Sequence, residues 1–259
     1  MKSSAIGYPN IFIRISIMAG LIIFIESYQL KLFSQSIQAR DSLRKIFYSS
    51  DYPDTTRLVA GKALVWNYYT LMPDKDSNLL INEEVYKLAK EVGSPKQEIH
   101  SLMDLGMAWD FLGRIDKKIL FMEEAHQKSL KLNWFEGLSR SSYNLSFAST
   151  LIGDKENALK WMKKSVEYGL KSKIPLNIGM AYYGLAEMQE EKIIDNYFMN
   201  ETWNEEAEKI LKAAILNAKK GVQNLEKSSF KRGLIDVNSA LVRLYSLNGF
   251  LSPLPLNFH

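Results

Sequence analysis

A period of forty residues constrains this chain more than any other feature of its sequence. Leu105 recurs in register as Leu145 and Leu185, and one period earlier as Val65. Further in-register pairs are Trp109 with Tyr69, Gly113 with Gly153, and Glu123-Glu124 with Glu83-Glu84. A fixed period of this length indicates a repeat array, in which each unit buries its apolar face against the next unit.

Each period has the pattern of two helices joined by a short turn. In the segment 98–136 an apolar helix leads to a turn at Gly113, and a longer amphipathic helix follows. Gly113 is placed where the backbone after a helix needs a positive φ, and Asp116 is predicted to cap the second helix. Small residues, such as Gly106 and Ala125, stand where two helices must approach closely.

This order of residue types resembles the tetratricopeptide repeat (TPR). The Leu-Gly-x-x-Tyr pattern of its first helix is present as Leu-Gly-Met-Ala-Trp at 105–109, and Gly113 and Gly153 match its turn glycine. The period fits the longer HEAT repeat by length, but the residue pattern favours a TPR variant with a longer second helix. The resemblance covers roughly residues 58–250. It implies an all-α, right-handed α-solenoid of stacked antiparallel helix hairpins.

Composition and charge limit the possible functions. The formal charge is +4, from 33 basic and 29 acidic residues, and no basic stripe alternates with aromatic residues, so nucleic acid is not expected as a partner. The chain has no cysteine, which excludes disulfides and zinc–cysteine sites. No metal site and no cofactor are predicted.

Residues 1–36 differ from the rest of the chain and are predicted to be a signal peptide or a signal anchor. Lys2 and Arg14 precede an apolar run from Ile15 to Ile25, and Ser34-Gln35-Ser36 offers small residues for cleavage. The predicted location is therefore periplasmic, or membrane-anchored and facing the envelope. The alternative is a cytoplasmic protein whose N-terminal helix packs on the array.

Residues 37–259 are predicted to form the repeat array, with about four units and terminal half-units. A short amphipathic helix at 38–49 would cap it, with Leu43, Ile46 and Phe47 on one face. The fourth unit exceeds the period, and the excess is placed partly in a turn at 192–203 and partly in a longer second helix. Full units are predicted at Thr55–Gly93, Ser94–Asn133 and Trp134–Ser172, with a fourth from Ile174.

The last predicted helix runs from Ser229 to Leu247 and ends at Asn248-Gly249. The tail that follows contains Pro253 and Pro255, which disfavour a regular helix. The array would then stop at half a unit. Either the tail caps the open face, or the sequence is a shortened part of a longer natural chain. An open face would be a candidate surface for self-association.

The sequence shows no catalytic constellation. His100 and His126 fall on different helices without a metal-ligand partner, and each is expected to be solvated or locally paired. Adjacent glutamates, such as Glu190-Glu191, point about 100° apart on a helix, so they are interpreted as a solvated face rather than as an acid–base pair.

The TPR resemblance implies that the first helices line a concave groove. The groove positions, carried over by register, form a mixed aromatic and polar strip that suits a protein or an extended peptide. Arg140, Asn67 and Arg243 are too scattered to form a clamp for a ligand carboxylate. The predicted groove residues are Asn67, His100, Met103, Asp110, Arg140, Tyr143, Phe147, Tyr183, Glu187, Asp236 and Arg243.

A wider resemblance concerns three short motifs near the N-terminus. Asp-Ser-Leu-Arg-Lys-Ile at 41–46, Asp-Thr-Thr-Arg-Leu at 54–58 and Pro73-Asp74 are similar to the N-terminal repeat sensor region of certain bacterial signalling proteins. The resemblance implies an exported sensing or scaffolding module.

Three function classes follow from the sequence. The first is a non-enzymatic scaffold, exported or membrane-tethered through residues 1–36, that binds a protein or peptide. The second is a cytosolic TPR adaptor or co-chaperone. The third is an enzyme, which the sequence does not favour because no group of titratable residues is predicted to converge.

Overall fold

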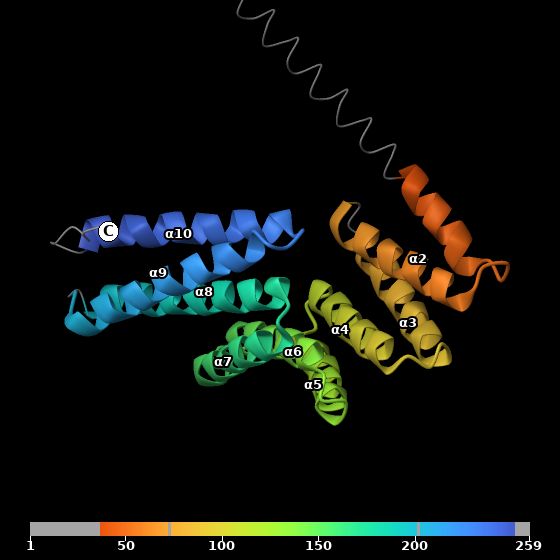
Figure 1. The fold of residues 1–259 in the computed structure, drawn as a ribbon, viewed down its shortest axis with the longest axis horizontal. Coiled ribbons are helices and arrows are strands. Elements are labelled where there is room, and N and C mark those ends of the chain that lie inside the picture. The colour runs from red at the N-terminus through yellow and green to blue at the C-terminus, as the bar shows by residue number, and fades with distance from the viewer. Residues whose placement is uncertain (1–36, 72–73, 201–202, 252–259) are drawn as a thin grey trace, which may run out of the picture. The chain divides into compact units, whose positions relative to one another are not determined.

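The structure, a computed structural model, describes residues 37–71, 74–200 and 203–251, and its regular elements there are all helical (Figure 1). This confirms the all-α class. The chain divides into two compact units, Met1–Val92 and Gly93–His259. The predicted export segment, the predicted cleavage site and the proline-containing tail lie outside the described residues.

The first unit contains a helix at 37–48, α2 (Asp54–Trp66), the π-helix η1 (Asn67–Leu71) and α3 (Lys75–Glu91). Phe47 is buried in its core, and Leu43 and Ile46 are partly buried against the same core, so the predicted capping helix is confirmed. Its apolar face packs there because the α2–α3 hairpin cannot cover its own apolar side.

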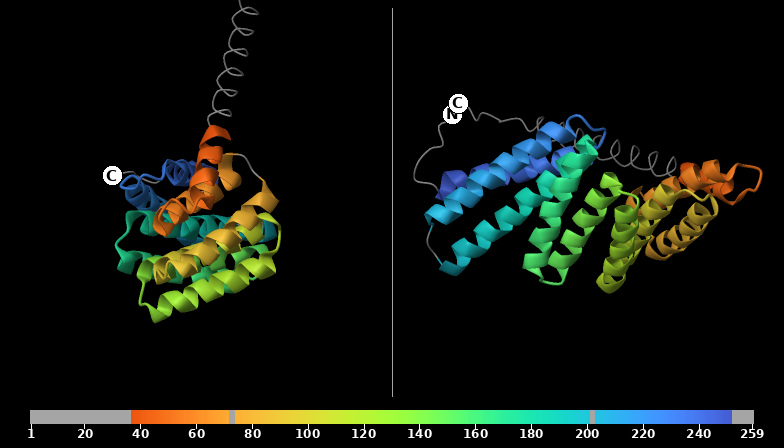
Figure 2. Two further views of the ribbon diagram at one scale, coloured as in Figure 1. Left: turned by 90° about the vertical axis from the view of Figure 1, so that its right-hand side faces the viewer. Right: turned by 60° about the horizontal axis from the view of Figure 1, so that its bottom comes forward.

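The second unit contains three hairpins and a final helix, which follow one another in chain order (Figure 2). The first helices of successive hairpins also contact one another, α4 with α6, α6 with α8, and α8 with α10. They therefore form one continuous layer. The helices are α4 (Pro95–Phe111), α5 (Ile115–Lys131), α6 (Phe135–Leu151), α7 (Lys155–Ser172), α8 (Pro175–Asn200), α9 (Glu205–Leu225) and α10 (Lys231–Leu251).

The turns inside the hairpins use glycine as expected. Gly113 and Gly153 have φ of +77° and +79°, a region that only glycine enters without strain. The prediction that Asp116 caps α5 is wrong. Arg114 occupies the cap position, and its guanidinium donates to the Asp116 carboxylate over 2.9 and 2.8 Å, so Asp116 lies in the first helical turn.

Small residues allow the helices of one hairpin to approach each other. A Cβ at Gly106 would lie 3.0 Å from Met122 Cε, and the Ser146 hydroxyl donates to the Ala158 carbonyl over 2.7 Å. Ala186 is fully buried at the equivalent place in α8. Gly106 and the fully buried Ala125 are the small residues that the sequence placed at such approaches.

The fourth unit departs from the prediction in two places. The segment placed in a turn at 192–203 is largely helical, because α8 continues to Asn200 and buries Ile193 in the core. Helix α9 begins after Asn204, whose side chain accepts a hydrogen bond from the Ala207 amide over 2.9 Å. Helix α10 runs through Asn248 and Gly249 instead of ending there. Among the helices of the described ranges, none is both long and apolar enough to cross a membrane.

His126 lies in the core between α5, α6 and α7. Its side chain is 4% exposed, and its Nδ1 lies 2.9 Å from Ser141 Oγ. The ring packs edge-on against Trp161, with 5.1 Å between ring centroids. Burial, aided by the nearby Lys164 charge, lowers the pKa of His126 from 6.5 to about 4. The expected local pairing of this histidine is confirmed.

We expect His126 to make folding stability depend on pH between about 6.5 and 4. The unfolded chain takes up the proton first as the pH falls, so the free energy of unfolding should drop by up to about 3 kcal/mol across this window. Urea unfolding at pH 7, 5.5 and 4 measures the drop. The variant His126→Phe keeps the contact with Trp161 and should lose that part of the pH dependence. Equal pH dependence in both proteins would contradict the assignment.

Candidate groove pocket

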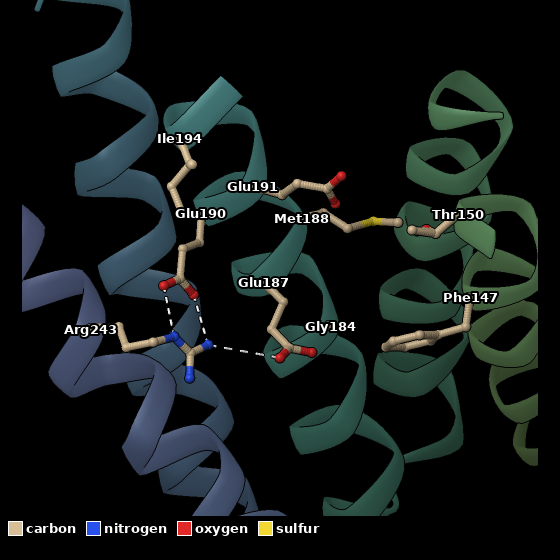
Figure 3. A pocket seen from close by; sticks show the side chains of 9 residues that line it. All are labelled: Phe147, Thr150, Gly184, Glu187, Met188, Glu190, Glu191, Ile194 and Arg243. Atoms are coloured by element: carbon tan, nitrogen blue, oxygen red, sulfur yellow. Dashed lines mark hydrogen bonds and ion pairs between the residues drawn. The ribbon is translucent and has the colours of Figure 1, made fainter. Parts of the chain in front are cut away.

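A pocket of about 390 Å³ opens between the first helices of the last units, α6, α8 and α10 (Figure 3). Three of the predicted groove residues line it, one from each helix: Phe147, Glu187 and Arg243. The structure thus brings together residues almost a hundred positions apart, as the repeat register implied. The remaining lining residues are Thr150, Gly184, Met188, Glu190, Glu191 and Ile194.

One wall of the pocket is an ion pair between α10 and α8. The Arg243 guanidinium donates through Nε and Nη2 to both carboxylate oxygens of Glu190, each over 2.8 Å. Glu190 is only 6% exposed, so its interpretation as part of a solvated face is wrong. The sequence could not show this pairing, because Arg243 comes from a helix fifty-three positions further along the chain.

Glu187 stands one helical turn before Glu190 and faces the pocket. Its Oε1 accepts a hydrogen bond from the Tyr183 hydroxyl over 2.7 Å and lies 3.9 Å from Arg243 Nη2. Burial raises the pKa of the Glu187 carboxyl, and the charges of Glu190 and Asp236 raise it further, although Tyr183 and Arg243 act in the opposite direction. Burial is therefore the main reason that the charged form of Glu187 is disfavoured.

On α6 the pocket is lined by Phe147 and Thr150, and Tyr143 packs beside Phe147. The rings of Tyr143 and Phe147 pack with 4.8 Å between centroids. Burial, then the negative charge of Glu187, raises the pKa of Tyr143, and burial likewise raises the pKa of Tyr183. The Asp236 carboxylate also raises both. Five predicted residues from three helices, Tyr143, Tyr183, Glu187, Asp236 and Arg243, consequently belong to one electrostatic cluster.

A second group of predicted residues lies nearer the start of this unit, between α4 and α6. Arg140 Nη1 lies 2.9 Å from His100 Nδ1, and Glu136 Oε1 lies 4.0 Å from both side chains. The His100 ring packs edge-on against Trp134, with 4.9 Å between centroids. Arg140 and His100 are thus engaged with each other and form a separate polar patch.

Two predicted groove positions are corrected. Asn67 and Met103 are buried, so both side chains belong to the cores of their units and not to an open surface. Asp110 accepts from the buried ammonium of Lys118 over 2.6 Å and keeps 23% of its side-chain exposure, so its groove position stays a prediction. The helical register indicates the direction in which a side chain points from its helix, but it does not show whether a neighbouring side chain covers that residue.

Sequence reasoning missed several residues that line the pocket. Gly184 was not distinguished from its neighbours, although its missing side chain leaves room for Tyr143 and Met162. Met188 and Ile194 were not assigned to the groove. The spacing of Gly184, Glu187, Glu191 and Ile194, every three or four residues on one helix, is the signal that could have identified them. In the described ranges, no group of three His, Asp or Glu side chains is arranged to hold a metal ion.

Comparison with known proteins identifies the fold. BtubC (BKLC) from P. vanneervenii is 13% identical, with a TM-score of 0.54 over 89% of this chain and 96% of that one. A putative kinesin light chain of Podospora anserina, with nearly identical TPR-like repeats, is 16% identical, with a TM-score of 0.50 over 75% of this chain and 87% of that one. No protein-family profile and no curated protein matches the sequence.

The fold defined by these likenesses is a helical-repeat solenoid. It is, more narrowly, the TPR-like fold, which confirms the predicted fold class and the TPR resemblance.

We expect Gly184→Ala to destabilise the protein. The new methyl group would overlap Met162 Cε and lie 2.9 Å from Met162 Sδ and 3.1 Å from Tyr143 Cε2. Met162 is fully buried, so relief requires neighbouring core side chains to shift, which costs about 1–3 kcal/mol.

The matched control is Gly249→Ala in α10, where an added methyl group meets no atom within 4 Å. There the same change should raise stability by up to about 1 kcal/mol, because alanine favours a helix over glycine. Thermal unfolding of both variants tests the pair. Destabilisation of the same size at both positions would refute the proposed close contact.

Proposed function

We propose that this protein is a non-enzymatic repeat scaffold that binds a segment of a partner protein in its groove. The observation that carries the proposal is the convergence of Phe147, Glu187 and Arg243 from three successive first helices on one pocket. The repeat register alone predicts all three as groove residues. Such a pocket takes one or two side chains, while the rest of an extended segment contacts the neighbouring helices.

The groove offers the two kinds of contact that peptide recognition needs. Phe147, Met188 and Ile194 provide apolar surface, and the carboxylates and guanidinium provide oriented polar contacts. The His100–Arg140 patch, which lies between α4 and α6 of the same unit, would extend the contact along the layer of first helices.

A filled pocket should abolish peptide binding. Thr150 on α6 lines the pocket, whereas its neighbour Leu151 is 60% exposed and lies outside it. We expect peptides selected from a random display library on the full chain to lose at least about tenfold in affinity on Thr150→Trp, because the indole occupies their site. Leu151→Trp should bind them normally. Fluorescence anisotropy measures both, and equal binding by the two variants would place the peptide site elsewhere.

We further propose that residues 1–36 direct the scaffold out of the cytoplasm or tether it to the membrane. The basic residues before the apolar run Ile15–Ile25 support this, as does the resemblance to exported sensor regions of bacterial signalling proteins. The alternative is a cytosolic adaptor in which the same residues pack as a helix on the array.

Intact mass after expression in a bacterium, with separation of the soluble and membrane fractions, distinguishes these alternatives. We expect either a periplasmic product lacking about the first 36 residues, if the signal is cleaved, or the full-length mass in the membrane fraction, if it is an anchor. The full-length mass in the cytosol would contradict export and favour the adaptor.

A further inference from the structure

The pocket between α6, α8 and α10 has an excess of negative charge. Three carboxylates line it, from Glu187, Glu190 and Glu191, against the single guanidinium of Arg243. Glu190 already holds that guanidinium through two hydrogen bonds of 2.8 Å. Arg243 therefore has little capacity left to neutralise the other two carboxylates.

A neighbouring pocket of about 500 Å³ does not share this excess of negative charge. It lies among α6, α7, α8 and α9, and its charged lining consists of three lysines and three carboxylates. There Lys155 pairs with Glu191 over 3.4 Å and with Asp195. Glu191 thus has a cation on that side, which leaves Glu187 as the carboxylate of the groove pocket with the weakest compensation.

Glu187 is placed to contact a ligand. Its side chain retains 32% of its exposure, and among the described residues nothing donates a hydrogen bond to its Oε2. Figure 3 shows its carboxylate between Arg243 and the aromatic ring of Phe147. The raised pKa of this carboxyl has burial as its main cause, and a bound cation would offset that cost.

The apolar lining selects among cations. Phe147, Met188 and Ile194 present a surface that a hydrated metal ion would not use, but the aliphatic stem of a lysine or arginine side chain packs well on such a surface. The charged end of that side chain could then reach Glu187, and Figure 3 shows the Phe147 ring facing this carboxylate from α6.

We propose that the groove pocket binds a lysine or arginine side chain of a basic, partly apolar partner segment, with Glu187 as its carboxylate. This inference deepens the proposed function and depends on it. The same pocket should disfavour a ligand carboxylate. An acidic group would be repelled by Glu187, Glu190 and Glu191, and the guanidinium of Arg243 is already paired.

The test uses three pools of labelled random peptides that share one apolar frame and differ in carrying lysine and arginine, glutamine, or aspartate and glutamate. On the full chain we expect the basic pool to bind at least about fivefold more tightly than the neutral pool, and the acidic pool to bind least. The preference should shrink as sodium chloride is raised, because salt screens the attraction.

Two single-charge variants localise the effect. Glu187→Gln should weaken binding of individual basic peptides by about fivefold or more. The same variant should not lower the melting temperature, because burial disfavours this carboxylate in the folded protein. Glu167→Gln, on the exposed side of α7 where Glu167 pairs with Lys171 over 2.6 Å, makes the same change in net charge away from the pocket. It should bind basic peptides like the unchanged protein.

The possible outcomes separate this inference from the proposed function. If neutral or acidic peptides bind as well as basic ones, or if Glu187→Gln binds normally, recognition of a cationic side chain is refuted. The groove still stands as the binding site in that case, provided that Thr150→Trp blocks binding. If no pool binds the unchanged protein, both the groove function and its preference for basic segments are refuted.

Discussion

Burial of apolar helix faces is the constraint on which the rest of this structure depends. A single helix hairpin has no second surface to cover its apolar side, so each hairpin of the second unit is stable only beside its neighbour. Close approach is possible because small residues stand at the crossings, among them Gly106, Ser146 and Ala186. The first helices form a common layer as a result, and side chains that face away from the second helices gather on one surface. The pocket between α6, α8 and α10 is therefore a consequence of how the core is built.

The same packing explains why partly buried charged side chains are concentrated near α8. This helix contacts α6 on one side and α10 on the other, so charged residues that it directs toward the groove are partly shielded from water. Shielding strengthens interactions between the remaining charges, and an incompletely compensated carboxylate is then costly. Glu190 is compensated by Arg243, whereas Glu187 is compensated less completely.

Much of the fold could be predicted because the determining signals are local and repeated. In-register glycines fixed the hairpin turns at Gly113 and Gly153. Register also brought Phe147, Glu187 and Arg243 to one groove, although they are distant in sequence. The register gave the wrong local structure where the burial of one nearby side chain decides between a helix and a turn. Residues 192–200 continue α8 because the buried side chain of Ile193 favours a helix over a turn, and a count of surplus residues cannot distinguish those two structures.

The length of α8 has a further consequence for recognition along the array. Helices α4 and α6 have 17 residues each, whereas α8 has 26, which makes it longer by about 14 Å at 1.5 Å per residue. In an array of identical repeats, a partner could slide by one unit and find the same contacts again, so its position would be ambiguous. The long hairpin removes this translational symmetry. A partner segment that fits against α8 can therefore occupy only one position along the array. The helices on the two sides of α8 are different, so the two ends of that segment would meet different surroundings.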